Sequence, residues 1–268
     1  MVSSDSGETP HGTSFTIRVV DSLIAVTLAP RCAACASVLD RPGDGPVCAN
    51  CWSSIRPIAP PLCRTCGDPL PSWRTISLVM ERCAACRRRP RPLDAGRAAG
   101  EYEGALRHII HAFKYERRRR LAPRLGELLR AAGHDLLTGA DCVIPVPLHP
   151  WRRVRRGFNQ ACDLAATLGP PVVRALWRTR ATPAQTGLTA AGRRKNMRGA
   201  FRLSPLLSGR TLRTMLANRI VVLVDDVRTT GATLDACALA LKQAGVREVR
   251  ALTVARAALR QSRTPRRM

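Results

Sequence analysis

The sequence predicts an α/β protein with a parallel β-sheet, preceded by a cysteine-rich region that metal ions stabilise. Residues 220–224 form an apolar, β-branched run without polar alternation, which is typical of a parallel strand buried on both faces. A helical pattern and a further apolar run at residues 246–254 complete a βαβ unit. Four Cys-x-x-Cys pairs precede this domain, between residues 32 and 86.

The apolar run at residues 220–224 ends abruptly at Asp225 and Asp226. Ligands of open α/β sheets bind at the carboxyl ends of the strands, where this acidic pair is expected. Hydroxyls, a flexible backbone and a helix N-terminus follow, and together they form an anion cradle that suits a phosphate. These residues are Thr229, Thr230, Gly231 and Thr233.

The two halves of this stretch require opposite charges in the ligand. Carboxylates repel phosphate, so Asp225 and Asp226 need hydroxyl donors or a cation such as Mg²⁺ beside them. A sugar phosphate meets both requirements, with ribose hydroxyls on the carboxylates and its 5'-phosphate in the Thr/Gly loop. The alternative is an acidic strand end followed by a capped helix that binds no ligand.

Eight of the eleven cysteines form the four pairs, which we expect to bind structural Zn²⁺. They are Cys32, Cys35, Cys48, Cys51, Cys63, Cys66, Cys83 and Cys86. The gaps of 12 and 16 residues between pairs fit two consecutive zinc ribbons. A cross-braced arrangement, in which the first and third pairs share an ion, and the loss of one metal are the alternatives. A disulfide framework would require secretion, and a redox motif is usually a single pair.

Charge and hydropathy indicate the compartment and the partners. The net charge of +25 would attract nucleic acid, acidic lipid or another polyanion, although an arginine-biased composition also explains it. The sequence lacks the run of roughly 18–20 apolar residues that a membrane-spanning helix requires. The amino terminus has no basic segment of the kind that begins a signal peptide, so we expect a cytoplasmic protein.

The chain divides into four predicted parts. Residues 1–13 are a polar, disordered tail, and residues 14–92 contain a short amphipathic helix at 17–29, the cysteine pairs and a basic linker at 87–92. Residues 93–259 form the α/β domain, and residues 260–268 are a basic tail. Residues 206–218 predict an inserted helix or turn for which the sequence suggests no function.

Within the α/β domain, residues 97–102 predict an edge strand, and helical patterns follow at 105–113 and 121–129. The four arginines at 117–120 are either a solvated face or a patch that tracks phosphates. A buried strand at 141–148 leads into a basic loop at 149–160 and a helix at 161–168, which suits a second anion such as pyrophosphate. His149 in this loop is either a base or a hydrogen-bonding loop residue.

The carboxyl-terminal part predicts a helix at 234–244 that ends at Gly245. Cys142, Cys162 and Cys237 lie outside the four pairs and are predicted core residues.

Several longer motifs carry a resemblance to a known family. They are Pro-Val-Pro-Leu-His at 145–149, Arg-Arg-Gly-Phe-Asn-Gln at 155–160, Gln-Thr-Gly-Leu at 185–188 with Arg193 and Asn196, and Gly-Ala-Phe at 199–201. With Phe113-Lys114-Tyr115 and the cysteine pairs, they resemble the ComF (ComFC/GntX-like) family from about residue 23 to residue 256. Residues 220–233 also resemble the phosphoribosyl-pyrophosphate (PRPP) signature of type I phosphoribosyltransferases.

The resemblance implies a double zinc ribbon joined to a Rossmann-like domain with the type I phosphoribosyltransferase fold. The acidic pair would meet the PRPP ribose and Mg²⁺, and the "phosphate loop" (residues 229–233) would bind the 5'-phosphate. The implied ligand-binding residues are Asp225, Asp226, Val227, Thr229, Thr230, Gly231, Ala232 and Thr233. The basic segment at 178–198 would match the flap that closes over the site. The pyrophosphate and flap candidates are Lys114, His149, Arg152, Arg156, Asn159, Gln160, Gln185, Arg193 and Asn196.

Arg228 departs from the phosphoribosyltransferase signature, in which a small or apolar residue is usual at this position. The sequence is compatible with a phosphate contact by Arg228 or with a side chain that points outward.

Three functions follow from these observations. The first is phosphoribosyl transfer from PRPP to a nitrogenous acceptor, with Asp225 and Asp226 as the catalytic pair. The second is a non-catalytic protein of DNA uptake that binds single-stranded DNA or a helicase, which the charge favours and the scarcity of aromatic residues disfavours. The third is a zinc-ribbon adaptor whose transferase fold is only a scaffold.

Overall fold

The computed structural model describes residues 29–70, 81–180, 192, 197, 199–205 and 209–257. The predicted tails at 1–13 and 260–268 lie outside these residues, as do all but the last residue of the helix predicted at 17–29 and most of the predicted flap. Among the described residues, no helix is long and apolar enough to cross a membrane.

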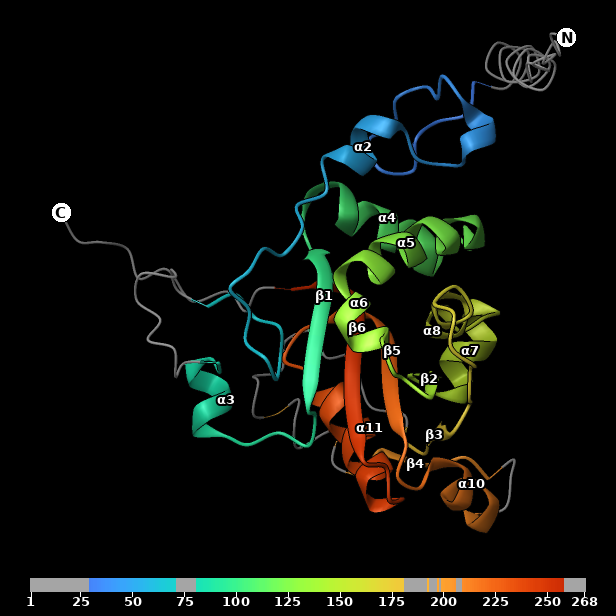
Figure 1. Ribbon diagram of the computed structural model, residues 1–268. Coiled ribbons are helices and arrows are strands. Elements are labelled where there is room, and N and C mark those ends of the chain that lie inside the picture. The colour runs from blue at the N-terminus through green and yellow to red at the C-terminus, as the bar shows by residue number, and fades with distance from the viewer. Residues whose placement is uncertain are drawn as a thin grey trace, which may run out of the picture.

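A four-stranded parallel sheet in the order β1-β6-β5-β2 forms the centre of the molecule (Figure 1). Its strands are β1 (Ala95–Glu101), β2 (Cys142–Pro145), β5 (Ile220–Arg228) and β6 (Glu248–Arg256). The predicted α/β class is therefore confirmed, and the edge strand predicted at 97–102 is β1. A separate antiparallel pair joins β3 (Leu176–Arg178) to β4 (Phe201–Leu203), on either side of the predicted flap.

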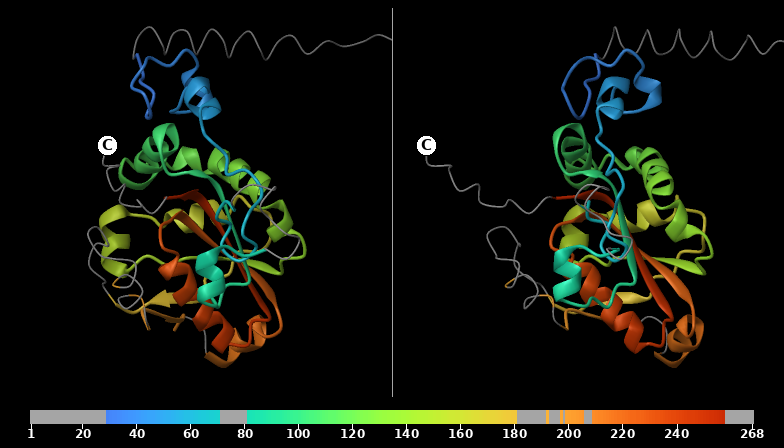
Figure 2. Two further views of the ribbon diagram at one scale, coloured as in Figure 1. Left: turned by 90° about the vertical axis from the view of Figure 1, so that its left-hand side faces the viewer. Right: turned by 60° about the vertical axis from the view of Figure 1, so that its left-hand side comes forward.

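Helices cover both faces of the sheet, which explains why residues 220–224 of the central strand β5 are all apolar. On one face, α4 (Gly104–Tyr115), α5 (Ala122–Ala132) and α8 (Gln160–Ala165) form a core with Val222 and Val224 of β5. On the other face, α10 (Gly209–Leu216), α11 (Ala232–Gln243) and the β3–β4 pair form a second core with Val221 and Leu223. Figure 2 shows these layers on opposite sides of the sheet. Successive side chains of a strand point to opposite faces, so each of these residues serves one core.

Shorter elements complete the described chain. They are η1 (Pro42–Asp44), α2 (Ala49–Ser53), α3 (Ala84–Arg88), η3 (Arg119–Leu121), α6 (His134–Leu137) and α7 (Pro150–Arg156). The lobe that contains η1 and α2 lies beyond α4, and the guanidinium of Arg124 in α5 lies 5.1 Å from the ring centroid of Trp52 in α2 (Figure 1).

The structure corrects three predictions about element boundaries. The loop predicted at 149–160 contains α7, because Pro150 suits the first turn of a helix and the side chain of His149 accepts a hydrogen bond from the Trp151 amide, at 3.3 Å. The linker predicted at 87–92 begins within α3, because the last cysteine pair forms a helical turn that continues to Arg88. β5 does not end at the acidic pair but continues to Arg228, because β6 runs beside it as far as Arg256.

Other predictions concern the packing of single segments. The described part of the inserted segment predicted at 206–218 contains α10, whose Leu212 and Leu216 are buried in the second core. Cys142 and Cys237 are core residues as predicted, whereas Cys162 is only half-buried, since α8 buries Gln160, Ala161, Leu164 and Ala165 instead. Gly245, with φ of 89°, follows Ala244, the C-cap of α11, as the predicted helix end requires.

Candidate functional site

The acidic pair lies on β5, close to the carboxyl end of the sheet. Asp226 accepts an ion-paired hydrogen bond from Lys114 Nζ of α4 at 2.8 Å, and both side chains are about 85% buried (13% and 15% exposed). The amide of Asp226 donates to Asp225 Oδ1 at 2.9 Å. Because neighbouring strand residues alternate, Asp226 turns toward the α4 face and Asp225 toward the α11 face.

The two carboxylates of the pair have different electrostatic environments. Burial and the charge of Asp226 raise the pKa of Asp225 to about 7, against the opposing effects of Lys114 and Arg178. Burial alone would lower the pKa of Lys114, but the charge and hydrogen bond of Asp226 more than offset it and raise that pKa. Lys114 therefore remains an ammonium group, and Asp225 is the carboxylate that a hydroxyl donor or cation would stabilise most.

The phosphate loop connects β5 to α11 through a left-handed turn. Gly231 has φ of 76° and precedes the first residue of α11, and the Ala232 amide donates to Thr230 Oγ1 at 3.4 Å. Thr233 Oγ1 donates to Met197 Sδ at 3.8 Å. Val227 packs against the first core, and Ala232 is buried in the second. The amides at the start of a twelve-residue helix and two threonine hydroxyls thus meet next to the acidic pair.

The basic segment after β2 is tied to α4, which carries Lys114. Gln160 Nε2 donates to the Lys114 carbonyl at 3.4 Å, and Arg156 Nη1 donates to Gln160 Oε1 at 3.2 Å. Asn159 caps α8 by accepting from the Ala161 amide, and its Nδ2 donates to the carbonyl of Val146. The described part of this segment therefore lies against the helix that supplies Lys114 to the acidic pair.

Some of the pyrophosphate and flap candidates lie outside the described residues. They are the side chain of Arg152 and all of Gln185, Arg193 and Asn196. The roles of the other pyrophosphate and flap candidates stay predictions.

The eight paired cysteines form two groups of four, each made of consecutive Cys-x-x-Cys pairs. Within each group all four Sγ atoms lie within 4.8 Å of one another. We call these the first zinc ribbon (Cys32, Cys35, Cys48, Cys51) and the second zinc ribbon (Cys63, Cys66, Cys83, Cys86). The cross-braced alternative is therefore wrong.

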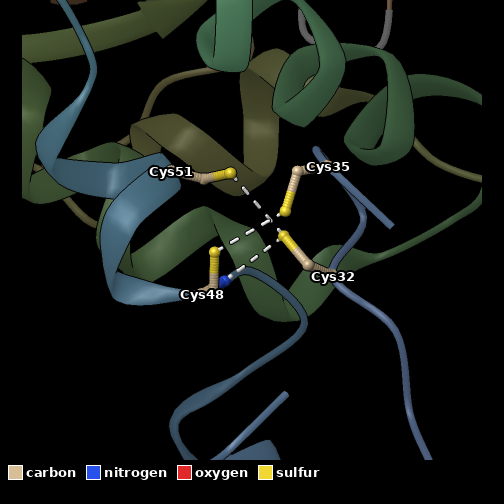
Figure 3. Close-up of side chains that lie close together, drawn as sticks. All are labelled: Cys32, Cys35, Cys48 and Cys51. Atoms are coloured by element: carbon tan, nitrogen blue, oxygen red, sulfur yellow. Dashed lines mark hydrogen bonds between the residues drawn. The ribbon is translucent and has the colours of Figure 1, made fainter. Parts of the chain in front are cut away.

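The first group shows how the chain prepares such a site (Figure 3). Its sulfur atoms point toward one another, with Cys32 Sγ and Cys51 Sγ 3.8 Å apart and Cys35 Sγ and Cys48 Sγ also 3.8 Å apart. Backbone amides of Ala34 and Cys48 donate to Cys32 Sγ at 3.4 Å. Amide donors stabilise a thiolate, and four thiolates are the tetrahedral set of a structural zinc site without an open position. The residues thus fit Zn²⁺.

The second zinc ribbon packs directly on the edge strand β1. The Gly96 amide donates to the Arg64 carbonyl at 3.3 Å. A Cβ atom on Gly67, whose φ is 68°, would lie 2.4 Å from the carbonyl oxygen of Gly96. Only glycine permits this approach of the two backbones.

Comparisons with known proteins agree with this architecture over most of the chain. A curated relative in Haemophilus influenzae, named Competence protein F, is 31% identical over 237 residues, which is 85% of this chain and 97% of the relative. The chain belongs to the ComF family. DNA utilization protein YhgH of Escherichia coli O157:H7 is 34% identical over 77% of this chain and 88% of its own length. Competence protein ComFC of Bacillus subtilis is 27% identical over 75% of this chain and 80% of its own length.

Two domain families match different parts of this ComF-family chain. A double zinc ribbon domain matches residues 23–87, and a phosphoribosyl transferase domain matches residues 156–267. The second range contains β5, the acidic pair and the phosphate loop, while β1 and β2 precede it and belong to the same sheet. The protein thus combines a double zinc ribbon with a phosphoribosyltransferase-like parallel-sheet domain. A solved structure titled as the allosteric regulatory enzyme of purine biosynthesis aligns with a TM-score of 0.32 and 23% identity, over 50% of this chain and 25% of that chain.

The sequence allows two arrangements of Arg228, a phosphate contact or a side chain that points outward. In the structure of this ComF-family chain, Arg228 adopts neither of them. It is 6% exposed, and its Nη2 donates to Asp68 of the second zinc ribbon. Asp68 Oδ1 also accepts from Arg256 Nε at 2.6 Å, and Arg256 Nη1 donates to Glu101 at 2.9 Å. Asp68 is therefore connected to the last residues of β5 and β6 and, through Arg256, to the last residue of β1.

Two further arginines lie near the site, in the segments predicted as a flap and a linker, and their contacts were not predicted from the sequence. Arg178 of β3 is buried, and its guanidinium lies 5.5 Å from the Phe201 ring centroid. Its positive charge opposes the rise in the pKa of Asp225. Arg91 lies in the predicted linker and donates to both carboxylate oxygens of Asp235 in α11, at 2.8 and 3.1 Å. No local motif indicates the partners of Asp68 and Arg91, because these partners are 144 to 188 residues away in the sequence.

Proposed function

We propose that this protein binds PRPP, or another ligand with a ribose 5-phosphate group, together with Mg²⁺ at the carboxyl end of β5. The observation that carries the proposal is the juxtaposition of the acidic pair with a helix N-terminus. Asp225 and Asp226 lie eight and seven residues before Thr233, and the left-handed Gly231 in between is the N-cap of α11. Carboxylates and free helix amides suit the ribose and the phosphate of one ligand.

In this proposal, each end of the ligand has its own residues. The phosphate loop binds the 5'-phosphate through backbone amides and the hydroxyls of Thr229, Thr230 and Thr233. Asp225 and Asp226 accept hydrogen bonds from the ribose hydroxyls. Mg²⁺ would supply charge neutralisation between these carboxylates and the pyrophosphate oxygens, and the carboxylate pair fits its preference for oxygen ligands. The neighbourhood of Lys114 and Arg156 supports pyrophosphate binding on the α4 side.

The reaction that this site supports is phosphoribosyl transfer. The bond from C1 of the ribose to pyrophosphate breaks with both electrons leaving on pyrophosphate, and a nitrogen of the acceptor forms a new bond to C1 and releases a proton. The acidic pair stabilises the positive charge that develops on the sugar, so that catalysis is electrostatic and positional.

Calorimetry with PRPP and Mg²⁺ tests the ligand site. We expect the wild-type protein to bind and the Asp225→Ala/Asp226→Ala variant to lose binding. A matched control is Asp141→Asn, because Asp141 pairs with Arg219 and the Ile220 amide at the opposite end of β5. A wild-type protein that releases no heat with PRPP or ribose 5-phosphate would remove the basis of the proposal.

A second candidate function is binding of single-stranded DNA, alone or with a helicase. Two of the few aromatic residues support it, because Tyr115 and Trp151 are exposed (55% and 72%) on neighbouring basic helices. The guanidinium of Arg156 lies 4.9 Å from the Tyr115 ring centroid. Exposed rings among arginines are the surface that unpaired bases stack on. The names of the relatives, which refer to competence and DNA utilization, agree with this candidate.

A further inference from the structure

We propose that the second zinc ribbon positions the phosphate loop, so that occupancy of this zinc site and ligand binding at the loop are thermodynamically coupled. Asp68 and Arg91 are the positioning residues. The inference rests on the proposed function in one respect: PRPP is the probe of the loop.

The first contact lies immediately before the loop. Arg228, the residue that precedes Thr229, has a side chain only 5% exposed, and Asp68 Oδ1 accepts from its Nη2. Within the described residues, Nε of Arg228 is buried without a hydrogen-bond partner. A buried guanidinium with an unsatisfied donor depends strongly on its carboxylate, since without that charge it would be unpaired in a dry environment. Asp68 lies two residues after Cys66, within the segment that the metal holds.

The second contact lies immediately after the loop. Arg91 follows the zinc ligand Cys86 by five residues, and it ion-pairs with Asp235 in the first turn of α11. Its Nη2 lies only 2.0 Å from the position that a Cβ on Gly231 would take. Pro92 restricts Arg91 to extended backbone conformations, so this side chain is presented from a stiff segment.

These contacts leave the phosphate loop held at both ends by one small region. Within the described residues the second ribbon offers little apolar surface: its buried cluster consists of Cys63, Cys66 and Cys86 with Leu70 and Cys83 beside it. Metal must therefore supply most of the free energy that fixes Asp68 and the segment leading to Arg91. Loss of zinc from this site would release both ends of the loop, whereas the first zinc ribbon packs against α4 and α5 and, among the described residues, has no recorded interaction with either end.

Coupling between two sites is reciprocal, which gives a test that does not depend on catalysis. If zinc favours PRPP binding, PRPP must raise the equilibrium affinity of the second site for zinc by the same factor. The test measures zinc release from the full-length protein to a zinc-selective dye, with and without PRPP and Mg²⁺. We expect PRPP to protect one of the two zinc ions, and the Asp225→Ala/Asp226→Ala variant corrects for direct chelation by PRPP.

The positioning residues are tested with a matched pair of amide substitutions. Asp68→Asn should weaken PRPP binding roughly tenfold, within the 5- to 150-fold range typical of coupled sites, and should abolish the protection of zinc. Glu81→Gln is the control, because Glu81 is also a carboxylate of the second zinc ribbon but pairs with the exposed Arg64, at 3.3 Å. It should leave both measurements unchanged.

The outcomes separate this inference from the proposed function. If the wild-type protein binds PRPP, but Asp68→Asn binds it equally well and PRPP protects no zinc, the coupling is refuted and the ligand site stands. If the wild-type protein does not bind PRPP, the proposed function fails, and hydrogen exchange then decides the inference. Asp68→Asn should accelerate amide exchange at residues 228–235 relative to Glu81→Gln, and equal exchange in the two variants would overturn the positioning role.

Discussion

Asp225 and Asp226 are adjacent in the sequence but experience different surroundings. The ion pair with Lys114 keeps Asp226 in a satisfied, nearly buried position. Asp225 faces the other side of the sheet, where burial and its neighbour's charge raise its pKa to about 7. A carboxylate held in this way destabilises the folded protein, and a ligand that stabilises its charge would relieve this cost. Such groups are common in binding sites.

The raised pKa of Asp225 predicts a pH-dependent gain of stability in Asp225→Asn. A carboxyl group with a folded pKa above its ordinary 3.8 binds protons more tightly in the folded state, so it lowers the free energy of unfolding as the pH rises from about 4 to about 7. The asparagine side chain of the variant does not titrate. Chemical denaturation should therefore find the variant more stable than wild type above pH 7, by at most about 4 kcal/mol, with the difference shrinking toward pH 4.

Asp141→Asn should show the opposite sign. The hydrogen bond from the Ile220 amide and the pairing with Arg219 lower the pKa of Asp141. A lowered carboxyl pKa contributes stability above the ordinary value, and this contribution is lost as the pH falls through the folded pKa. The variant should be less stable than wild type at neutral pH, with a difference that narrows in acid. Parallel pH profiles for the two variants would contradict both assignments.

How well the sequence predicts a residue's role depends on how local its partners are. The zinc ligands, the acidic pair and the phosphate loop are each contained in a short motif whose spacing limits the geometry. Asp68 carries no such signal, and although Lys114 belongs to a recognisable motif, its pairing with Asp226 arises only through the fold. Arg228 was recognised as unusual in its motif, but its partner 160 residues away was not predictable from the local pattern.

At the scale of elements, the turn between β5 and α11 has the most exacting requirements. Gly231 combines a left-handed backbone with the close approach of Arg91 Nη2. The sequence predicts a flexible glycine in an anion cradle, but Arg91 comes from a segment that the sequence predicts to be a basic linker. The strand and helix on either side were predictable because their apolar periodicity is long and regular, whereas α7 was missed because its seven residues are mostly arginine.

Gly231→Ala should therefore cost more than an ordinary glycine substitution. The left-handed conformation alone costs an alanine about 1–2 kcal/mol, and the added methyl group would displace Arg91 from its pair with Asp235. We expect a total loss of about 2–4 kcal/mol in the free energy of unfolding, together with loss of PRPP binding. Urea denaturation and calorimetry measure the two effects.

Gly139→Ala is the control for this substitution. Gly139 has a similar φ of 70°, and no atom lies within 4 Å of an added Cβ. It should incur only the backbone cost and retain PRPP binding. Equal losses of stability in the two variants would show that Arg91 adjusts freely, against our interpretation of the turn.

At the scale of the whole molecule, the net charge of +25 governs the encounter with polyanions. If single-stranded DNA is a partner, its affinity should fall at least about tenfold between 50 and 200 mM salt, because bound phosphates release counterions. Fluorescence anisotropy with a labelled oligonucleotide measures this dependence. An affinity that does not change with salt would exclude phosphate contacts as its source.

The exposed aromatic residues allow stacking to be separated from charge. Tyr115→Ala or Trp151→Ala should weaken oligonucleotide binding by about 1–3 kcal/mol without changing the salt slope, since neither substitution removes a charge. Val154→Ala is the control, because Val154 is comparably exposed on α7 (78%) but offers no ring for a base to stack on. If all three variants bind as wild type does, the α4–α7 surface is not where DNA stacks.

The position of Asp68 also constrains how the molecule assembles during synthesis. The ribbon that contains it leaves the ribosome early, yet Arg228 and Arg256, its partners, are 160 and 188 residues further along the chain. The edge strand β1 likewise waits for β6, the last strand of the described sheet. Zinc can therefore fold the amino-terminal ribbons long before their docking surface exists, and the sheet closes only when nearly the whole chain has been made. A chain that stops before β6 would leave both β1 and Asp68 without their partners.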